Sequence, residues 1–422
     1  MCPPVGGAEA ALLDNIRPWD YPHPMSFSEF ISPVSVEQFM ADIFGKKPLH
    51  VPAGGSVSRQ GAISWGRLNE LLAVRSQWTP QKLKLIMNSR PISAEHYIEE
   101  ANTLEGVVRR AAPAKIDVFL AMGASLVANA VEEVAPEVQE TASLLGQQFW
   151  ALVGANAYCS SRSVQAFASH CDLHEVFAVQ CEGEKVWNIY KNRAVAPVVA
   201  LQGEDAQQII DAAKGPILMQ VRMRPGDLLY IPRGFYHDAL ASSEASLHVT
   251  FSVAQLTGLA IFELLAEHAA EEEIFREYLP DARLEGGRLL EQRLSELSAK
   301  MAGLLKEKRL AAQLRDRQRG LWQPHCKFRL PERQQLDFFA RTDRQAQLSL
   351  QNSAPVLVTR GRTFELDDLA TAAEWLLSRP AFALQELFAT FPRLDRSNLR
   401  KLVGHLEAEG VLVRYEPKLG SA

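Results

Sequence analysis

The sequence lacks long apolar runs and holds few cysteines. No stretch approaches the roughly 20 consecutive apolar residues that a membrane-spanning helix requires. The first ten residues carry no basic segment followed by an apolar run, so no secretory signal is predicted there. The 5 cysteines are an odd number without CxxC spacing, which argues against a disulfide framework and a cysteine-based zinc site. We therefore expect a cytoplasmic protein with no membrane partner.

The remaining composition is that of a globular protein of several domains. Of 422 residues, 47% are hydrophobic and 23% are charged, which is enough apolar material for real cores. The length suggests two or three domains. The net charge of −5 gives the chain as a whole no electrostatic signature of a nucleic-acid-binding protein.

Helices with short strands between them are predicted up to about residue 145. Residues 1–25 are rich in proline and glycine and form a lead-in to the first domain. Ser35, followed by Glu and Gln, is typical of a helix N-cap. A further helix is predicted over residues 131–148, with Pro136 near its start.

Short β-type runs follow, separated by turn signals. The turns are predicted at Glu182-Gly183, at Pro225-Gly226-Asp227 and at Pro232-Arg233-Gly234. Many short strands with regular turns favour a sandwich or a barrel. The predicted strands are residues 149–153, 175–180, 185–190, 217–221, 227–231 and 247–253.

The sequence after residue 255 is helical and then changes character again. Gly286-Gly287 is expected to break the helical region, and a 4-3-4-3 apolar spacing then predicts the seam of a packed helix pair. The apolar stripe consists of Leu290, Leu294, Leu297, Met301 and Leu304. The basic stretch 306–319 is interpreted as a solvated helix face.

The last hundred residues predict a small domain with the element order of a winged helix. Helices are expected over residues 383–388 and 395–406, with a strand over 411–415. From Leu321 onward there are 14 Lys and Arg residues against 12 Asp and Glu, a net charge of only +2. This charge is weak for phosphate neutralisation, so a structural or protein-docking role is favoured over nucleic-acid binding.

The motif His170-Cys171-Asp172 carries the strongest chemical signal. On an extended chain, alternate side chains share a face, so His170 and Asp172 are expected to point the same way. Two histidines and one carboxylate form the triad that binds Fe(II) and leaves coordination positions open. His237, at the mouth of the turn that follows Tyr230, is the candidate for the third ligand. With 10 histidines, one HxD tripeptide is weak evidence, but the PGD turn and the PRGxxH sequence strengthen it.

Residues 26–254 resemble the JmjC branch of the cupin superfamily, the Fe(II)- and 2-oxoglutarate-dependent oxygenases, and are most similar to the ribosomal oxygenases. The similar stretches are residues 44–50 (FGKKPLH), 156–158 (NAY), 170–172 (HCD), 180–187 (QCEGEKVW) and 225–237 (PGDLLYIPRGFYH). The resemblance implies an α+β protein with a double-stranded β-helix, or jelly-roll, core. The implied domains are a lead-in (1–25), a JmjC catalytic domain with N-terminal helices (26–254), a helical dimerisation region (255–320) and a winged helix (321–422).

The resemblance also implies site residues and cofactors. His170, Asp172 and His237 would be the iron ligands. Lys185, fifteen residues after His170, would bind the distal carboxylate of 2-oxoglutarate, and a dianion in a half-buried barrel does need a charge partner. Asn156 and Tyr158 match positions near the co-substrate. The implied cofactors are Fe(II), 2-oxoglutarate and O2.

Some positions depart from the family pattern or remain open. Cys171 replaces an aromatic residue that is common between the two ligands, and alternation turns it away from the metal, so catalysis should survive. His174 continues the series of residues on the same face and is either solvated or a substrate contact. His248 is either a pocket residue or core packing. Trp187, Phe177 and Phe251 are interpreted as core residues.

The implied function is a homodimeric protein hydroxylase that releases succinate and carbon dioxide. Its substrate would be an Arg or His side chain of a ribosomal protein. Another peptide substrate and lysine demethylation remain open. Two other classes also remain open, a non-enzymatic cupin and winged-helix regulator and a cupin isomerase or dioxygenase that needs no 2-oxoglutarate. The second of these would not require Lys185.

Overall fold

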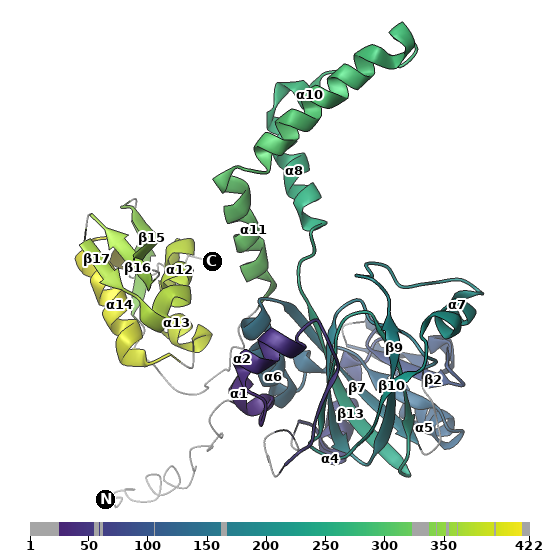
Figure 1. Ribbon diagram of the computed structural model, residues 1–422. Coiled ribbons are helices and arrows are strands. Elements are labelled where there is room, and N and C mark those ends of the chain that lie inside the picture. The colour runs from purple at the N-terminus through teal and green to yellow at the C-terminus, as the bar shows by residue number, and fades with distance from the viewer. Residues whose placement is uncertain are drawn as a thin grey trace, which may run out of the picture.

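The computed structural model describes residues 25–415 except 55–58, 60–61, 105, 162–166, 323–336, 343, 352–353, 361 and 392–393. The predicted lead-in lies outside the described residues except for Met25. Figure 1 shows a sheet-rich part, a set of helices that projects from it, and a small C-terminal part. Within the described residues, no helix combines the length and apolar character needed to cross a membrane.

The sheet-rich part contains two antiparallel sheets. The large sheet has the strand order β1-β11-β8-β13-β7-β6-β2-β3, and the small sheet has the order β10-β9-β12. The strands of the large sheet are β1 (Leu49–Val51), β2 (Leu83–Met87), β3 (Arg90–Pro91), β6 (Ser125–Ala128), β7 (Leu152–Ser161), β8 (Glu175–Glu182), β11 (Leu228–Ile231) and β13 (Ala245–Ala254). Those of the small sheet are β9 (Lys185–Arg193), β10 (Ile217–Met223) and β12 (Phe235–Ala241). A separate hairpin joins β4 (Ile98–Thr103) to β5 (Gly106–Ala111).

Strand β8 shows how the layers pack, because both of its faces are buried. Val176 and Ala178 belong to the core that includes Trp187 and Ile189 of the small sheet. Phe177 faces the opposite way, into the core shared with the N-terminal helices. The large sheet is therefore the middle layer of the structure.

Helices pack into the core on the other face of the large sheet. They are α1 (Phe27–Phe30), α2 (Val36–Gln38), α4 (Trp65–Ala73), α5 (Pro113–Ala121) and α6 (Pro136–Phe149). The Ser35 hydroxyl accepts a hydrogen bond from the Gln38 amide at 3.1 Å, so the predicted N-cap is confirmed. Aromatic rings fill this core. Phe39 and Tyr230 meet edge to face at 5.0 Å between ring centroids, and Phe177 lies 4.8 Å from Tyr230.

The strand predicted over residues 149–153 was wrong at its start. Phe149 ends α6, and Trp150 adopts the left-handed conformation of a C-cap, with φ of 47°. Strand β7 begins at Leu152. The apolar run 149–153 suggested a single strand, but Phe149 is buried at the end of α6 rather than in the sheet.

The projecting region consists of α8 (Ala260–Glu271), α9 (Glu273–Arg276), α10 (Arg288–Leu304) and α11 (Lys308–Leu321). As predicted, the chain breaks at Gly286 and Gly287, whose φ values are 63° and 88°. The predicted seam on α10 is not buried within the chain. Leu304 is buried, but Leu294 is 51% exposed and Met301 is 38% exposed.

Helix α7 (Ala206–Ala213) lies between β9 and β10 in the chain.

On α11, part of the basic stretch forms ion pairs rather than being simply solvated. Arg309 bonds Glu271 at 2.9 Å, and Arg317 bonds Glu263 at 2.8 Å.

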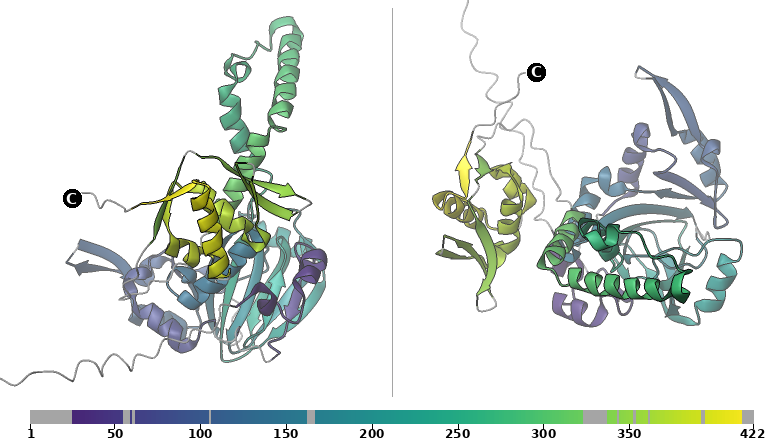
Figure 2. Two further views of the ribbon diagram at one scale, coloured as in Figure 1. Left: turned by 90° about the vertical axis from the view of Figure 1, so that its left-hand side faces the viewer. Right: turned by 90° about the horizontal axis from the view of Figure 1, so that it is seen from above.

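The C-terminal part, coloured yellow-green to yellow in Figure 2, has its own apolar core. Its sheets are β18-β14-β19 and β15-β16-β17. The strands are β14 (Phe338–Arg341), β15 (Ala346–Gln351), β16 (Ala354–Thr359), β17 (Arg362–Glu365), β18 (Ala381–Ala383) and β19 (Leu412–Arg414), and the helices are α12 (Ala370–Ser378), α13 (Leu384–Thr390) and α14 (Arg396–Ala408). The two predicted helices and the terminal strand are thus present, while the winged-helix classification stays a prediction.

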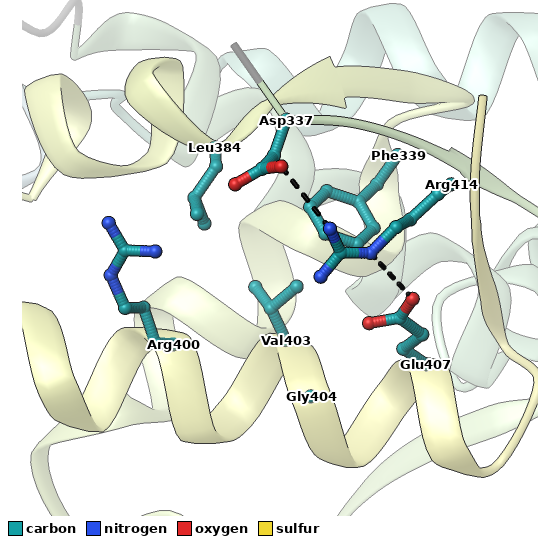
Figure 3. A pocket seen from close by; sticks show the side chains of 8 residues that line it. All are labelled: Asp337, Phe339, Leu384, Arg400, Val403, Gly404, Glu407 and Arg414. Atoms are coloured by element: carbon teal, nitrogen blue, oxygen red, sulfur yellow. Dashed lines mark hydrogen bonds and ion pairs between the residues drawn. The ribbon is translucent and has the colours of Figure 1, made fainter. Parts of the chain in front are cut away.

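A small pocket lies between α14 and strands β14 and β19 (Figure 3). The guanidinium of Arg414 occupies its wall and bonds Asp337 at 3.2 Å and Glu407 at 2.9 Å. These charges satisfy one another, so the pocket presents no unpaired carboxylate from either residue.

A substitution at Leu228 can test the packing of the large sheet as the middle layer. It is fully buried on β11, so Leu228→Ala should lower the free energy of unfolding by ~2–5 kcal/mol, through lost transfer energy and a cavity. The matched control is Leu218→Ala, which removes the same atoms at a position 51% exposed and should cost less than about 0.5 kcal/mol. Urea unfolding of both variants measures the difference. Equal effects would contradict this packing.

Candidate metal centre and its pocket

His170, Asp172 and His237 come together as the sequence motif predicted. Each offers one ligand atom, and these atoms all lie within 4.8 Å of one another. His170 and Asp172 lie before β8, and His237 lies on β12. The two histidines form an antiparallel bridge, with the His170 amide donating to the His237 carbonyl at 3.0 Å and the His237 amide donating back at 2.8 Å.

The segment of the HxD motif, expected to be extended, is not a regular strand, because His170 makes a single β-bridge and residues 171–172 are irregular. His237 lies shortly after the turn at Gly234, as expected, but on a strand, β12, that was not predicted. The Asp172 carbonyl accepts from the Gly234 amide at 3.0 Å, so the irregular segment is still tied to the turn before β12.

The backbone fixes which imidazole nitrogen faces the site. Nδ1 of His170 lies 2.9 Å from the Ala168 carbonyl, and Nδ1 of His237 lies 3.0 Å from the Phe235 carbonyl. A carbonyl can only accept, so each Nδ1 carries the proton and each Nε2 keeps a free lone pair. A buried carbonyl partner of this kind is what orients metal-binding histidines.

The charge balance of the triad suits a divalent cation. Burial alone would raise the pKa of Asp172, but the imidazoles of His237, His170 and His174 hold this pKa below its usual value. Burial lowers the pKa of His237, and the neighbouring His170 lowers it further. The site therefore presents an ionised carboxylate beside two imidazoles, a donor set that suits Fe(II) with open positions.

Lys185 stands at the start of β9 with an unusual environment. It is 2% exposed, and its Nζ donates to the Ser160 hydroxyl at 3.4 Å. No carboxylate of the described residues forms an ion pair with it. Burial lowers the pKa of this amine to about 8. A buried cation without a counter-charge costs stability, so its position suits an anionic ligand.

Aromatic and polar side chains line the space around Lys185. Tyr158 on β7 lies directly opposite His248 on β13, and their rings stack at 4.8 Å with an angle of 6° between planes. Burial raises the pKa of Tyr158 to about 12, so its hydroxyl stays protonated at neutral pH. The Asn156 side chain is held by a hydrogen bond rather than by stacking, because its Oδ1 accepts from the Ala130 amide at 3.2 Å.

Two buried nitrogens near the triad, His248 Nδ1 and Trp187 Nε1, have no hydrogen-bond partner among the residues that the structure describes. The Trp187 ring lies 5.9 Å from that of His237 and 5.3 Å from that of His248. Trp187 was predicted as core, and it does pack in the core between the sheets. It also borders the metal centre, and this position was not predicted from the sequence. Phe177 and Phe251 are fully buried, as predicted.

Two other candidates lie at the edge of the site. His174 is half-buried, and its Nδ1 lies 3.3 Å from the Glu175 carbonyl. Cys171 is half-buried and is not among the clustered ligand atoms. Neither side chain belongs to the triad.

Residues 132–260 match the JmjC domain family model. This span contains the triad, Lys185 and the aromatic residues just described. The protein carries a JmjC domain. The cupin-type antiparallel core predicted from the sequence is thereby confirmed.

Two similar proteins are much longer than this chain. A protein of Culex quinquefasciatus named bifunctional lysine-specific demethylase and histidyl-hydroxylase NO66 is 31% identical over 246 residues, which are 58% of this chain and 36% of that protein. Ribosomal oxygenase 1 of Homo sapiens is 29% identical over 261 residues, 60% of this chain and 39% of that protein. The chain thus spans little more than a third of the length of these relatives.

A solved structure of similar size shares the fold. The X-ray structure of E. coli ycfD covers 90% of this chain and 98% of its own, with 16% identity and a TM-score of 0.50. A structure of the same Escherichia coli protein, titled a ribosomal oxygenase, contains cobalt and 2-oxoglutarate and has a TM-score of 0.48 at 15% identity.

The buried amine of Lys185 gives a stability prediction. Lys185→Met should raise the free energy of unfolding of the ligand-free protein at pH 7 by roughly 3 kcal/mol, since one pKa unit corresponds to about 1.4 kcal/mol. Because folding lowers this pKa from 10.5 to about 8, the penalty in the wild type is complete below pH 8 and disappears as the pH rises through 10.5. The gain should therefore shrink between pH 7 and pH 10.

The matched control is Lys191→Met on the same strand, where the lysine is exposed. Chemical unfolding at both pH values measures the two variants against the wild type. A Lys185→Met protein that is no more stable than the wild type at pH 7 would show that the amine has a partner in solution.

Proposed function

We propose that the protein is an Fe(II)- and 2-oxoglutarate-dependent protein hydroxylase. The observation that carries the proposal is the pairing of a His-Asp-His cluster with a buried, uncompensated lysine inside one JmjC domain. With iron and 2-oxoglutarate bound, this chemistry would use O2 to convert 2-oxoglutarate to succinate and carbon dioxide, with one oxygen atom going to succinate and the other to the hydroxyl group placed on an unactivated C–H bond.

Each residue then has a defined task. His170 and His237 would offer their Nε2 atoms to the iron, and Asp172 would offer one carboxylate oxygen. Lys185 would pair with the far carboxylate of 2-oxoglutarate, with the Ser160 hydroxyl beside it. Tyr158 would stand beside the same ligand as a neutral hydroxyl.

The residues fit these groups on independent grounds. The unpartnered nitrogens of His248 and Trp187 are hydrogen-bonding groups that a bound polar ligand can satisfy. A cupin oxygenase that needs no 2-oxoglutarate would have no use for the amine of Lys185. A non-enzymatic regulator would have no use for three converging metal ligands. These two alternatives therefore rank below the hydroxylase.

For the substrate, a ribosomal protein side chain, Arg or His, is favoured. The names of the relatives support it, since they include ribosomal oxygenase and histidyl-hydroxylase. The first name also contains lysine-specific demethylase, so demethylation is the second candidate within the same chemistry. A ribosomal substrate also agrees with the cytoplasmic location predicted from the sequence.

A homodimer is part of the proposal. The apolar stripe on α10 is only partly covered within one chain, with Leu294 and Met301 exposed. Figures 1 and 2 show α10 projecting away from the sheets, where a second copy can reach it. A two-fold interface would bury the same stripe on both copies.

The metal ligands supply the test of activity. Asp172→Ala should abolish 2-oxoglutarate turnover and weaken iron binding while the fold persists, because one ligand is lost from a preformed site. Succinate release and circular dichroism measure the two effects. Cys171→Ser is the matched control, since it alters the residue between the ligands and should keep turnover.

Mass spectrometry of ribosomal proteins can identify the substrate. Ribosomal proteins from cells with the wild type should carry a +16 Da change that is absent in cells with Asp172→Ala. Wild-type protein loaded with iron that consumes no 2-oxoglutarate would overturn the proposed function. A methyl-lysine loss of 14 Da in place of the +16 Da change would favour demethylation.

The dimer has a separate test. Leu297→Glu places a carboxylate in the middle of the stripe on each copy, at a cost of several kcal/mol if it stays charged and unpaired. We expect this variant to elute as a monomer in size-exclusion chromatography with light scattering. Ala299→Glu, on the exposed opposite face of α10, should remain dimeric. A wild type that is monomeric at micromolar concentration would contradict the dimer.

A further inference from the structure

A buried carboxylate, Asp238, lies directly behind the metal centre. It follows His237 on β12, so its side chain points to the opposite face of the small sheet. Its Oδ2 accepts from the Ser169 hydroxyl at 2.6 Å and from the Tyr190 hydroxyl at 2.7 Å. Its Oδ1 accepts from Asn188 Nδ2 at 2.9 Å. Asp238 is 8% exposed, so these are charge-assisted bonds largely sheltered from water.

The network joins the two chain segments that carry the proposed ligands. Ser169 precedes His170, and Asp238 follows His237, so their side chains meet behind the His170–His237 bridge. Asn188 lies opposite Asp238 in the β9–β12 register. One carboxylate thus connects β12, β9 and the ligand segment.

The backbone alone holds this region weakly. The β12–β9 register is interrupted between Phe235 and His237, beside the proposed ligand. The segment around His170 is joined to β12 by a single bridge rather than a ladder. Side-chain bonds on the outer face therefore supply constraints that the sheet does not.

Helix α7 and the residue after it fix Ser169 from the other side. Lys214 Nζ lies 2.9 Å from the Ser169 hydroxyl, and Gln207 Nε2 donates to the Ser169 carbonyl at 3.2 Å. An ammonium group can only donate, so the single hydroxyl proton of Ser169 is directed to Asp238. The bond from Ser169 to Asp238 therefore has one defined direction.

We propose that Asp238 is a positioning residue of the metal centre. Through Ser169, it sets the separation between the segment that carries His170 and Asp172 and the strand that carries His237. This inference rests on the proposed function, because it assigns a role within the same site. Lys185 points to the inner face of β9, away from this network, so Asp238 should govern metal affinity and leave co-substrate affinity unchanged.

The test compares metal binding in the full-length protein. Asp238→Ala should weaken Mn(II) binding by roughly 10–100-fold, the usual effect of losing a group that orients a metal ligand. At saturating Fe(II), the KM for 2-oxoglutarate should stay within about twofold of wild type, and turnover should recover as iron is raised. Asp205→Ala removes an exposed carboxylate just before α7 and is the control with unchanged Mn(II) affinity.

Two milder variants keep the test valid if Asp238→Ala fails to fold. Ser169→Ala removes only the link between the two ligand segments and should weaken Mn(II) binding severalfold. Asp238→Asn keeps the acceptor for Asn188 and should restore part of the affinity lost in Asp238→Ala. Wild-type Mn(II) affinity in the folded fraction of both alanine variants would overturn the inference. A wild-type protein that binds no Mn(II) or Fe(II) would instead overturn the proposed function.

Discussion

The candidate site depends on one backbone contact, the pair of hydrogen bonds between His170 and His237. These bonds bring a segment from before β8 against β12, more than sixty residues later in the chain. The same two residues also direct their Nδ1 protons to backbone carbonyls, which leaves both Nε2 atoms facing Asp172. Register, ring orientation and protonation are therefore set together before any metal arrives.

The pocket beside the triad carries polar groups at the expense of stability. Elsewhere, the space between the sheets is filled by residues such as Val176, Ile189 and Met223. Lys185 is buried there without a carboxylate partner among the described residues, and the nitrogens of His248 and Trp187 are unsatisfied. A core selected for packing alone would not retain such groups, because each costs free energy unless a ligand completes it. Their concentration in one place is the physical sign of a binding site.

The sequence predicted the triad well and its surroundings less well, for a physical reason. HxD and PRGxxH are local patterns, so their residues can be recognised without knowing the fold. Strand β12 was missed because its inward positions include His237, and a metal ligand there breaks the apolar alternation by which strands are recognised. Local rules are expected to fail at functional sites, where chemistry replaces packing.

Contacts between residues far apart in the chain could also not be predicted from sequence patterns. The partners of Asp238 come from the ligand segment and from β9, and no local spacing links Ser169 to Asn188. The stripe on α10 shows a related difficulty. Periodicity identifies an apolar face, but it does not tell whether the partner surface belongs to the same chain. The exposure of Leu294 and Met301 shows only that this face is incompletely covered within the described part of the chain.

One tryptophan connects the three parts of the molecule. Trp322, directly after α11, donates from Nε1 to the Ser143 carbonyl on α6 at 3.1 Å. A Cβ at Gly146 would lie 2.7 Å from the Trp322 ring, so glycine there permits the close contact. The same ring lies 6.4 Å from that of Phe391 in the C-terminal core. The projecting helices and the C-terminal part are thus both anchored to the helical layer that covers the large sheet. If the protein is the hydroxylase proposed above, a protein substrate that touches either accessory part would be oriented relative to the metal centre through this contact.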